Sequence, residues 1–124
     1  TQQSSGTWLV VILNTTTGDS FRKTITYKSS LSSAEWVEEA PSAGRQSTVP
    51  LDTFGAVSFA SATTVENGQQ RTIAQAGGLP VTMYNPAAQA LAQPSVLGSD
   101  GASFTVTRTD APASRPASRR RYIP

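Results

Sequence analysis

Short stretches of alternating apolar and polar residues, separated by turn-forming residues at roughly every 8 to 12 positions, run through most of this 124-residue chain. The alternation is clearest at residues 21–27 and 102–108. Serine and threonine together fill 32 positions, beside nine glycines and eight prolines, a composition that disfavours long helices. The sequence therefore predicts an all-β fold of about seven or eight short strands, arranged as an antiparallel β-sandwich or barrel.

The expected strands can be placed from the apolar spacing and the turn residues between them. An apolar run at residues 8–13, a turn at residues 14–19 and the alternation after it form a hairpin signature. Pro80 suits an edge strand or a strand start, and Gly55 allows a bulge. The strands are expected in these segments: residues 8–13, 21–27, 34–39, 54–60, 71–75, 79–84, 89–93 and 102–108.

The charge divides the chain into a body and a tail. Residues 1–110 carry six basic and eight acidic residues, whereas residues 111–124 carry four arginines and no acid. We expect one β-sandwich domain over residues 1–110 and a disordered Pro/Arg-rich tail over residues 111–124. The basic excess thus belongs to the tail and gives no reason to expect a nucleic-acid partner. The longest apolar run, Trp8 to Leu13, is far shorter than the roughly 20 residues of a membrane-spanning helix, so no membrane partner is expected.

The absence of cysteine and histidine restricts the chemistry that this chain can perform. It excludes disulfides, thiol nucleophiles, cysteine zinc sites, histidine-dependent triads and nearly every histidine-built metal centre. Any catalysis must use carboxylates, amides, hydroxyls or amines, and we expect neither a cofactor nor a metal. Composition and periodicity leave open a carbohydrate-binding module, an adhesin domain, a coat protein and a β-sandwich enzyme, because a fold does not determine a function.

Several ordered motifs point to one family. Residues 34–41, Ala-Glu-Trp-Val-Glu-Glu-Ala-Pro, resemble the Ala-Glu-Trp-aliphatic-x-Glu strand of the glutamic peptidases, also called eqolisins or the peptidase A4-like family. Residues 54–59 are similar to the Phe-Gly-x-Val-x-Phe strand of that family, and residues 81–84, 92–95 and 99–106 are similar to its closing strands. With the turn at residues 14–19, the resemblance covers roughly residues 7–108 in register and in order.

The resemblance implies a secreted endopeptidase that acts on polypeptides in acid and folds as a concanavalin-like β-sandwich of two packed antiparallel sheets. In that family the last glutamate of the Ala-Glu-Trp strand is the general base toward water, and a glutamine donates a hydrogen bond to the oxyanion. The base role falls on Glu39, whereas the glutamine motif lies upstream of anything matched by Thr1 to Gly6. The resemblance therefore implies the carboxy-terminal half of a domain, a partial domain whose amino-terminal half is missing and which is inactive alone.

A glutamate base and a glutamine hydrogen-bond donor are chemically suited to catalysis in acid. An unperturbed glutamate has a pKa of about 4.3, so it is ionised and basic in mild acid, and a neutral amide donor does not titrate. On a strand, Glu35, Val37 and Glu39 share one face, while Trp36 and Glu38 share the other. The Cα atoms of Glu35 and Glu39 lie roughly 13 Å apart along a regular strand, which favours a single base over a carboxylate pair.

The neighbours of Glu39 have less specific expectations. Glu35 either lines the same cleft and binds near the substrate, or is half-buried and paired with an arginine. Trp36, Phe54 and Phe59 are expected in the core. Six glutamines do not lie in the context of the family motif, and the oxyanion role is assigned to none of them: Gln46, Gln69, Gln70, Gln75, Gln89 and Gln93.

The alternative to an enzyme is a noncatalytic β-sandwich module that binds carbohydrate or protein. In that case Glu39 is a solvent-facing carboxylate at the end of a strand, beside a proline-containing loop. Arg119, Arg120 and Arg121 receive no role in either interpretation, because a short basic run is usually solvated.

Overall fold

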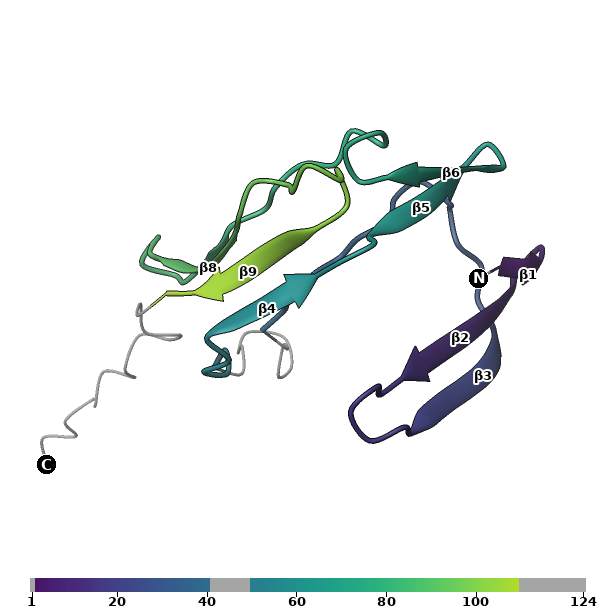
Figure 1. The fold of residues 1–124 in the computed structure, drawn as a ribbon, viewed down its shortest axis with the longest axis horizontal. Coiled ribbons are helices and arrows are strands. Elements are labelled where there is room, and N and C mark those ends of the chain that lie inside the picture. Colours follow the sequence, from purple (N-terminus) through teal and green to yellow (C-terminus); the bar gives the residue numbers. More distant parts are fainter. Residues whose placement is uncertain (1, 41–49, 110–124) are drawn as a thin grey trace, which may run out of the picture. The chain divides into compact units, whose positions relative to one another are not determined.

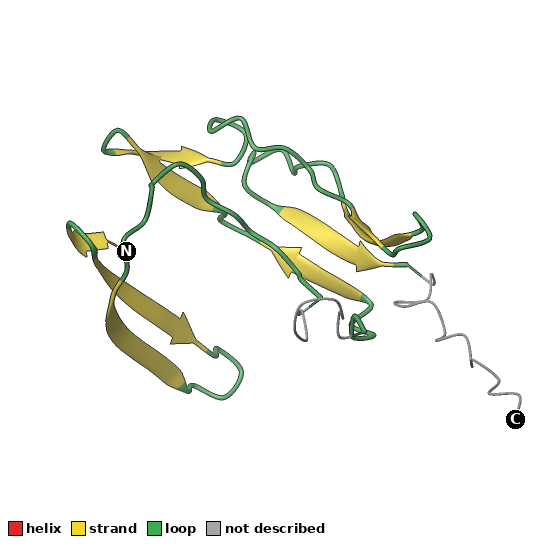
Figure 2. Cartoon of the chain, turned by 180° about the vertical axis from the view of Figure 1, so that it is seen from behind, coloured by secondary structure: helices red, strands yellow, loops and turns green. Residues whose placement is uncertain are grey.

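The computed structural model describes residues 2–40 and 50–109, and the regular structure within them consists of β-strands without a helix (Figure 2). None of the described segments is therefore a helix that could cross a membrane. The chain divides into two compact units, Thr1–Glu35 and Trp36–Pro124, which are described separately. The predicted all-β class and its antiparallel strand pairing are confirmed. The predicted tail and Gln46 lie outside the described residues.

The first unit holds a three-stranded antiparallel sheet in the order β1-β2-β3 (Figure 1). The strands are β1 (Gln2–Ser4), β2 (Thr7–Leu13) and β3 (Ser20–Thr26). All seven residues of β2 have partners on β3, from Thr7 opposite Thr26 to Leu13 opposite Ser20. The hairpin predicted from the alternation is confirmed, and its strands differ from the prediction by one residue at one or both ends.

The turn between β2 and β3 is held by short polar side chains. Asn14 Oδ1 accepts hydrogen bonds from the backbone N–H groups of Thr16 (2.9 Å) and Thr17 (3.2 Å). The Thr17 hydroxyl donates to the Asp19 carboxylate at 2.7 Å. Gly18 closes the turn with a φ of 80°, a left-handed conformation that costs a glycine little. These local hydrogen bonds explain why a six-residue connection can fix the register of a hairpin whose two strands have seven residues each.

The second unit holds a four-stranded antiparallel sheet in the order β4-β9-β8-β7. Its strands are β4 (Ala56–Phe59), β7 (Met83–Tyr84), β8 (Ala90–Pro94) and β9 (Phe104–Arg108). The pairing of the edge strand β4 with β9 places segments almost 50 residues apart side by side, with Phe59 opposite Phe104 and Val57 opposite Val106 (Figure 1). The edge position of β7 agrees with the interpretation of Pro80, which precedes it.

A separate hairpin in the second unit pairs β5 (Thr63–Glu66) with β6 (Gln69–Thr72). Asn67 and Gly68 form its two-residue turn with φ values of 52° and 76°, as a tight hairpin turn requires. The sequence analysis predicted no strand at β5 and placed β6 at residues 71–75. The reason is that β5 reads Thr-Thr-Val-Glu, which has no apolar alternation to mark a buried face.

The core of the second unit is small and lies against the four-stranded sheet. Its buried members come from β8, β9 and the segment before β4: Leu51, Leu91, Ala92 and Val106. Partly buried hydrophobic residues pack around them: Ala40, Phe54, Phe59, Met83 and Phe104. The core positions predicted for Phe54 and Phe59 are confirmed. Trp36 is half-buried and is absent from this cluster in the described part of the chain, so its predicted role as a core anchor is wrong.

The strand expected to end near Glu39 is not a strand in the structure. Residues 27–40 are assigned no regular element, and no ladder partner for residues 34–40 is found among the described residues. Alternation of side chains needs only an extended backbone, whereas a β-strand also needs a neighbour for its N–H and C=O groups. The Ala-Glu-Trp motif therefore predicted the extended backbone of this segment but not its pairing with another strand.

Candidate active site

The segment that carries Glu39 alternates between half-buried and exposed side chains. Trp36, Glu38 and Ala40 are half-buried, and Val37 and Glu39 between them are exposed. A period of two is the signature of an extended backbone packed on one side. The predicted separation of Glu38 and Glu39 onto opposite faces therefore agrees with the burial pattern.

Glu39 is exposed directly beside a residue that touches the core. Ala40 packs against the buried cluster that contains Leu51 and Val106, so the backbone next to Glu39 is tied to the four-stranded sheet. Within the described residues no group donates a hydrogen bond or forms an ion pair with the Glu39 carboxylate. An anchored backbone with an uncommitted, solvated carboxylate leaves its lone pairs available to a water molecule or a ligand.

Glu38 and Glu35 differ from Glu39 in their surroundings. Glu38 is half-buried on the packed side of the segment. Glu35 is exposed, and no arginine of the described residues forms an ion pair with it, which leaves the interpretation as a half-buried, arginine-paired residue without support. Glu35 ends the first unit and Glu39 belongs to the second, so the structure does not place these two carboxylates in one site.

The glutamines in the described residues serve local structure or are exposed on strands. Gln75 Oε1 accepts from the Thr72 backbone N–H at 3.0 Å, and Gln89 Oε1 accepts from Asn85 Nδ2 at 2.9 Å. Gln70 Nε2 donates to the Thr63 hydroxyl at 3.2 Å across the β5–β6 ladder. None of the described glutamines hydrogen-bonds Glu39. A glutamine next to Glu39 that could act as the oxyanion donor is therefore not found in this part of the chain.

Arg108 is a residue near this region that the sequence analysis did not single out. Its guanidinium donates to the carbonyls of Leu91 (3.1 Å), Thr109 (2.7 Å) and Asp52 (3.2 Å). These bonds tie the end of β9 to β8 and to the segment before β4, beside the cluster on which Ala40 rests. The sequence feature that could have indicated this role is the position of Arg108 on the same face of the alternating strand as Phe104 and Val106.

Asp100 uses its carboxylate to build a turn rather than a site. The Ser103 hydroxyl donates a short hydrogen bond to one carboxylate oxygen, and the Ala102 and Ser103 backbone N–H groups donate to the other, each at 3.0 Å. The Ser103 hydroxyl, followed by the Ala102 N–H, holds the pKa of Asp100 below its ordinary value, because both bonds favour the charged form. In the described ranges, no group of three or more acidic residues could hold a metal ion.

The architecture is similar to that of a solved structure, aspergilloglutamic peptidase from Aspergillus niger. The match has a TM-score of 0.61 and 23% sequence identity, and it covers 88% of this chain and 69% of that chain. At this identity the likeness concerns the fold alone. The likeness gives the chain the fold class of that structure, an all-β sandwich.

The family follows from a sequence comparison. The model of the Peptidase A4 family matches residues 1–109. A comparison with curated proteins gave no match. The chain belongs to the peptidase A4 family, and the family resemblance drawn from its motifs is confirmed. Membership makes it a peptidase by family, with polypeptides as the class of substrate.

Proposed function

We propose that this chain provides the general base of an acid-acting, secreted glutamic endopeptidase, and that the base is Glu39. The observation that supports this role is the setting of Glu39: an exposed carboxylate without a described partner, next to Ala40 on the core cluster. The Ala-Glu-Trp motif that contains it lies within the residues matched by the family model.

The proposed reaction is direct hydrolysis of a peptide bond by water. The Glu39 carboxylate accepts a proton from water while the water oxygen attacks the peptide carbonyl carbon, which gives a tetrahedral intermediate. Collapse of that intermediate breaks the C–N bond, and the proton held by Glu39 passes to the leaving amine. No histidine is needed, in agreement with a chain that contains none.

The oxyanion of that intermediate needs a donor, and we propose that it is a glutamine from a segment outside these 124 residues. Gln70, Gln75 and Gln89 are engaged in the local hydrogen bonds described above. Loss of one oxyanion donor typically lowers the rate by about 10²–10³-fold. The 124 residues alone are thus expected to show no measurable turnover.

The experiment compares this chain with a longer form that adds the glutamine-bearing segment of the family at its amino-terminal side. Both are assayed at pH 3–5 on a denatured protein substrate, with release of new amino termini as the readout. The longer form should cleave, and the same form with that glutamine changed to alanine should not. Cleavage by the 124 residues alone would refute the missing donor. Failure of a folded longer form to cleave would refute the peptidase role and favour the noncatalytic binding module.

A further inference from the structure

The chain contains three asparagines, each at a turn and each followed by a different kind of residue: Asn14-Thr15, Asn67-Gly68 and Asn85-Pro86. An asparagine side chain loses its amide nitrogen when the backbone nitrogen of the next residue attacks the side-chain carbonyl carbon, which makes asparagine one of the heat-sensitive residues. The attack requires an accessible N–H on the next residue and a side chain that is not held elsewhere. The three turns differ in both respects.

Asn67 and Gly68 form the turn between β5 and β6, and both residues are exposed. Among the described residues, no hydrogen bond is found to the Asn67 side chain or to the Gly68 N–H. A Cβ built on Gly68 would meet no atom within 4 Å, so the space around its nitrogen is open to solvent. The side-chain amide of Asn67 can therefore rotate, and the nitrogen that follows it has no Cβ to shield it.

The other two asparagines are held in place and have a blocked neighbour. Asn14 Oδ1 accepts two backbone hydrogen bonds of its own turn, and the next residue, Thr15, is branched at Cβ. Asn85 is buried, and its Nδ2 donates to Gln89 Oε1 at 2.9 Å. The residue after it is Pro86, which has no N–H to lose. The chain thus carries two internal controls for the reactivity of Asn67.

The β5–β6 hairpin is fixed at its base and open at its turn (Figure 1). The Ala62 N–H, just before β5, donates to the Ala102 carbonyl at 3.0 Å, whereas β5 and β6 pair only with each other among the described strands. Asn67 and Gly68 have φ values of 52° and 76°, and the backbone must rotate away from this turn before the nitrogen reaches the side-chain carbon. A two-stranded hairpin without a third strand opens locally at low cost.

We propose that Asn67 is a site of spontaneous modification, at which its side-chain amide is converted to a carboxylate through a cyclic imide. The Gly68 nitrogen gives its proton to the solvent and bonds to the side-chain carbonyl carbon of Asn67, and ammonia leaves. Water then opens the imide, which gives aspartate if the bond to the side-chain carbonyl breaks and isoaspartate if the bond to the main-chain carbonyl breaks. One water is consumed and one ammonia is released.

The rate of this conversion should rise with pH, because the Gly68 nitrogen attacks after it has lost its proton. The site is therefore preserved in mild acid and altered at neutral and higher pH. This proposal does not depend on the proposed function.

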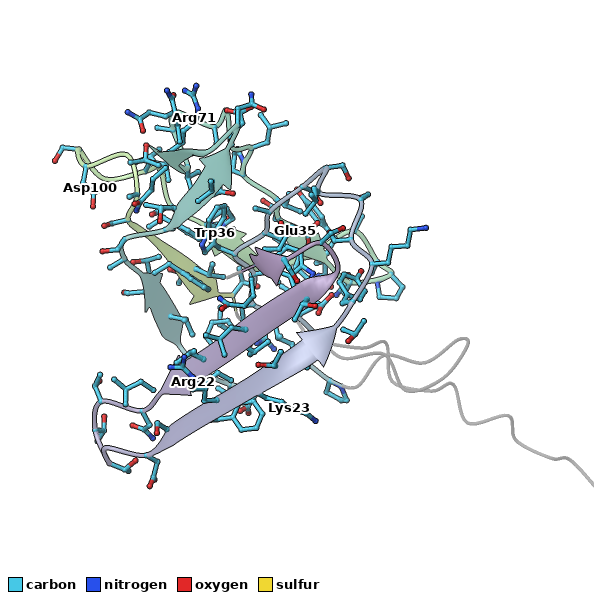
Figure 3. The ribbon with its side chains drawn as sticks, turned by 90° about the vertical axis from the view of Figure 1, so that its right-hand side faces the viewer. Arg22, Lys23, Glu35, Trp36, Arg71 and Asp100 are labelled. Atoms are coloured by element: carbon cyan, nitrogen blue, oxygen red, sulfur yellow. The ribbon has the colours of Figure 1, made fainter. Side chains whose placement is uncertain are left out.

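The two products should affect the hairpin differently. Aspartate keeps the backbone and adds a charge beside Glu66, whose carboxylate forms an ion pair with Arg71 of β6 at 2.7 Å (Figure 3). Isoaspartate adds one carbon to the backbone of a two-residue turn, and the tight pairing of Glu66 with Gln69 does not tolerate a longer turn of this kind. Isoaspartate should therefore loosen the hairpin, whereas aspartate should leave its register intact.

The test is incubation of the full 124-residue chain at pH 8 and at pH 4, followed by digestion with trypsin and mass spectrometry. Cleavage after Arg22, Arg45 and Arg71 places the three asparagines in separate peptides. Conversion adds one dalton, fragment spectra assign the residue, and an isoaspartyl methyltransferase labels the isoaspartate. At pH 8 we expect Asn67 to be converted at least about tenfold faster than either internal control. A sample digested without incubation corrects for conversion during digestion.

The variant Asn67→Asp separates the added charge from the lengthened backbone. Amide hydrogen exchange over residues 63–72 should be faster in the protein that has formed isoaspartate at pH 8 than in freshly prepared Asn67→Asp. The proposed site is wrong if Asn67 is converted no faster than Asn14, if the rate is equal at pH 4 and pH 8, or if no isoaspartate forms. Equal exchange in the isoaspartate protein and in Asn67→Asp would overturn the loosening of the hairpin.

Discussion

The rings of Phe59 and Phe104 stack with centroids 4.7 Å apart and planes 7° from parallel. The two residues are direct partners on β4 and β9. Each belongs to a separate family motif, one at residues 54–59 and the other at residues 99–106. The stacking therefore joins two distant segments of the resemblance at one point of the four-stranded sheet.

This contact should be measurable as a coupling energy. Phe59→Ala and Phe104→Ala should each lower the free energy of unfolding by about 2 kcal/mol or more, because each ring packs against the core cluster. The double variant should cost less than the sum by about 0.5–1.5 kcal/mol, the range for an aromatic pair. Urea unfolding of the four proteins measures this difference. Additive losses would show that the stacking contributes nothing beyond burial.

Arg108 should stabilise the second unit through its hydrogen bonds to three carbonyl groups. Arg108→Ala leaves the carbonyls of Leu91 and Asp52 without this donor, and it should lower the free energy of unfolding by about 2 kcal/mol. The exposed Arg22→Ala is the control and should change it by less than about 0.5 kcal/mol. Equal effects of the two variants in urea unfolding would contradict the bridging role.

Gly78 is required by its close approach to Ile73. A Cβ at position 78 would clash with Ile73 Cγ2, and Ile73 is buried and its χ1 is restricted by branching at Cβ, so the methyl group has little room to move. Gly78→Ala should cost about 1–3 kcal/mol through overpacking. In an Ile73→Ala background the same substitution should cost clearly less. A thermal-melt series that shows the same loss in both backgrounds would disprove the steric explanation.

The turn at Asp100 should make stability depend on pH in a defined direction. The folded-state pKa of Asp100 lies below its ordinary value of 3.8 because the Ser103 hydroxyl, and then the Ala102 N–H, stabilise the charged form. The resulting stabilisation is complete above that ordinary pKa and is lost as the pH falls through the lower, folded-state pKa. The difference in Tm between the wild type and Asp100→Asn should therefore be largest near neutral pH and shrink at low pH. A difference that grows as the pH falls would have the wrong sign.

The sequence predicted those parts of the fold in which local patterns and burial agree. The alternation at residues 21–27 and the turn at Asn14 specified the β2–β3 hairpin, because both signals act over a few residues. β5 was missed, since its Thr-Thr-Val-Glu sequence is defined by pairing with β6 across the Asn67-Gly68 turn rather than by a buried face. Tertiary pairing of this kind leaves little trace in a single segment.

The candidate site also combines features that follow from the local sequence with features that depend on distant segments. The exposed position of Glu39 and the half-buried position of Glu38 follow from the period of two in an extended chain. The missing ladder beside residues 34–40 and the bridging role of Arg108 could not be predicted, because both depend on segments far away in the sequence. No pattern in the chain identifies an oxyanion donor, so this part of the site stays a proposal.

The measurement that tests the role of Glu39 most directly is kcat at pH 3–5 for Glu39→Gln and Glu38→Gln, in the longer form that carries the glutamine-bearing segment. The two residues are adjacent and their substitutions are identical, but Glu39 is exposed and Glu38 is half-buried. Glu39→Gln should lower kcat by about 10²–10⁴-fold, the contribution of a general base, with little change in KM. Glu38→Gln should keep most of the activity. Equal losses in the two variants, or an active Glu39→Gln enzyme, would contradict the assignment of the base.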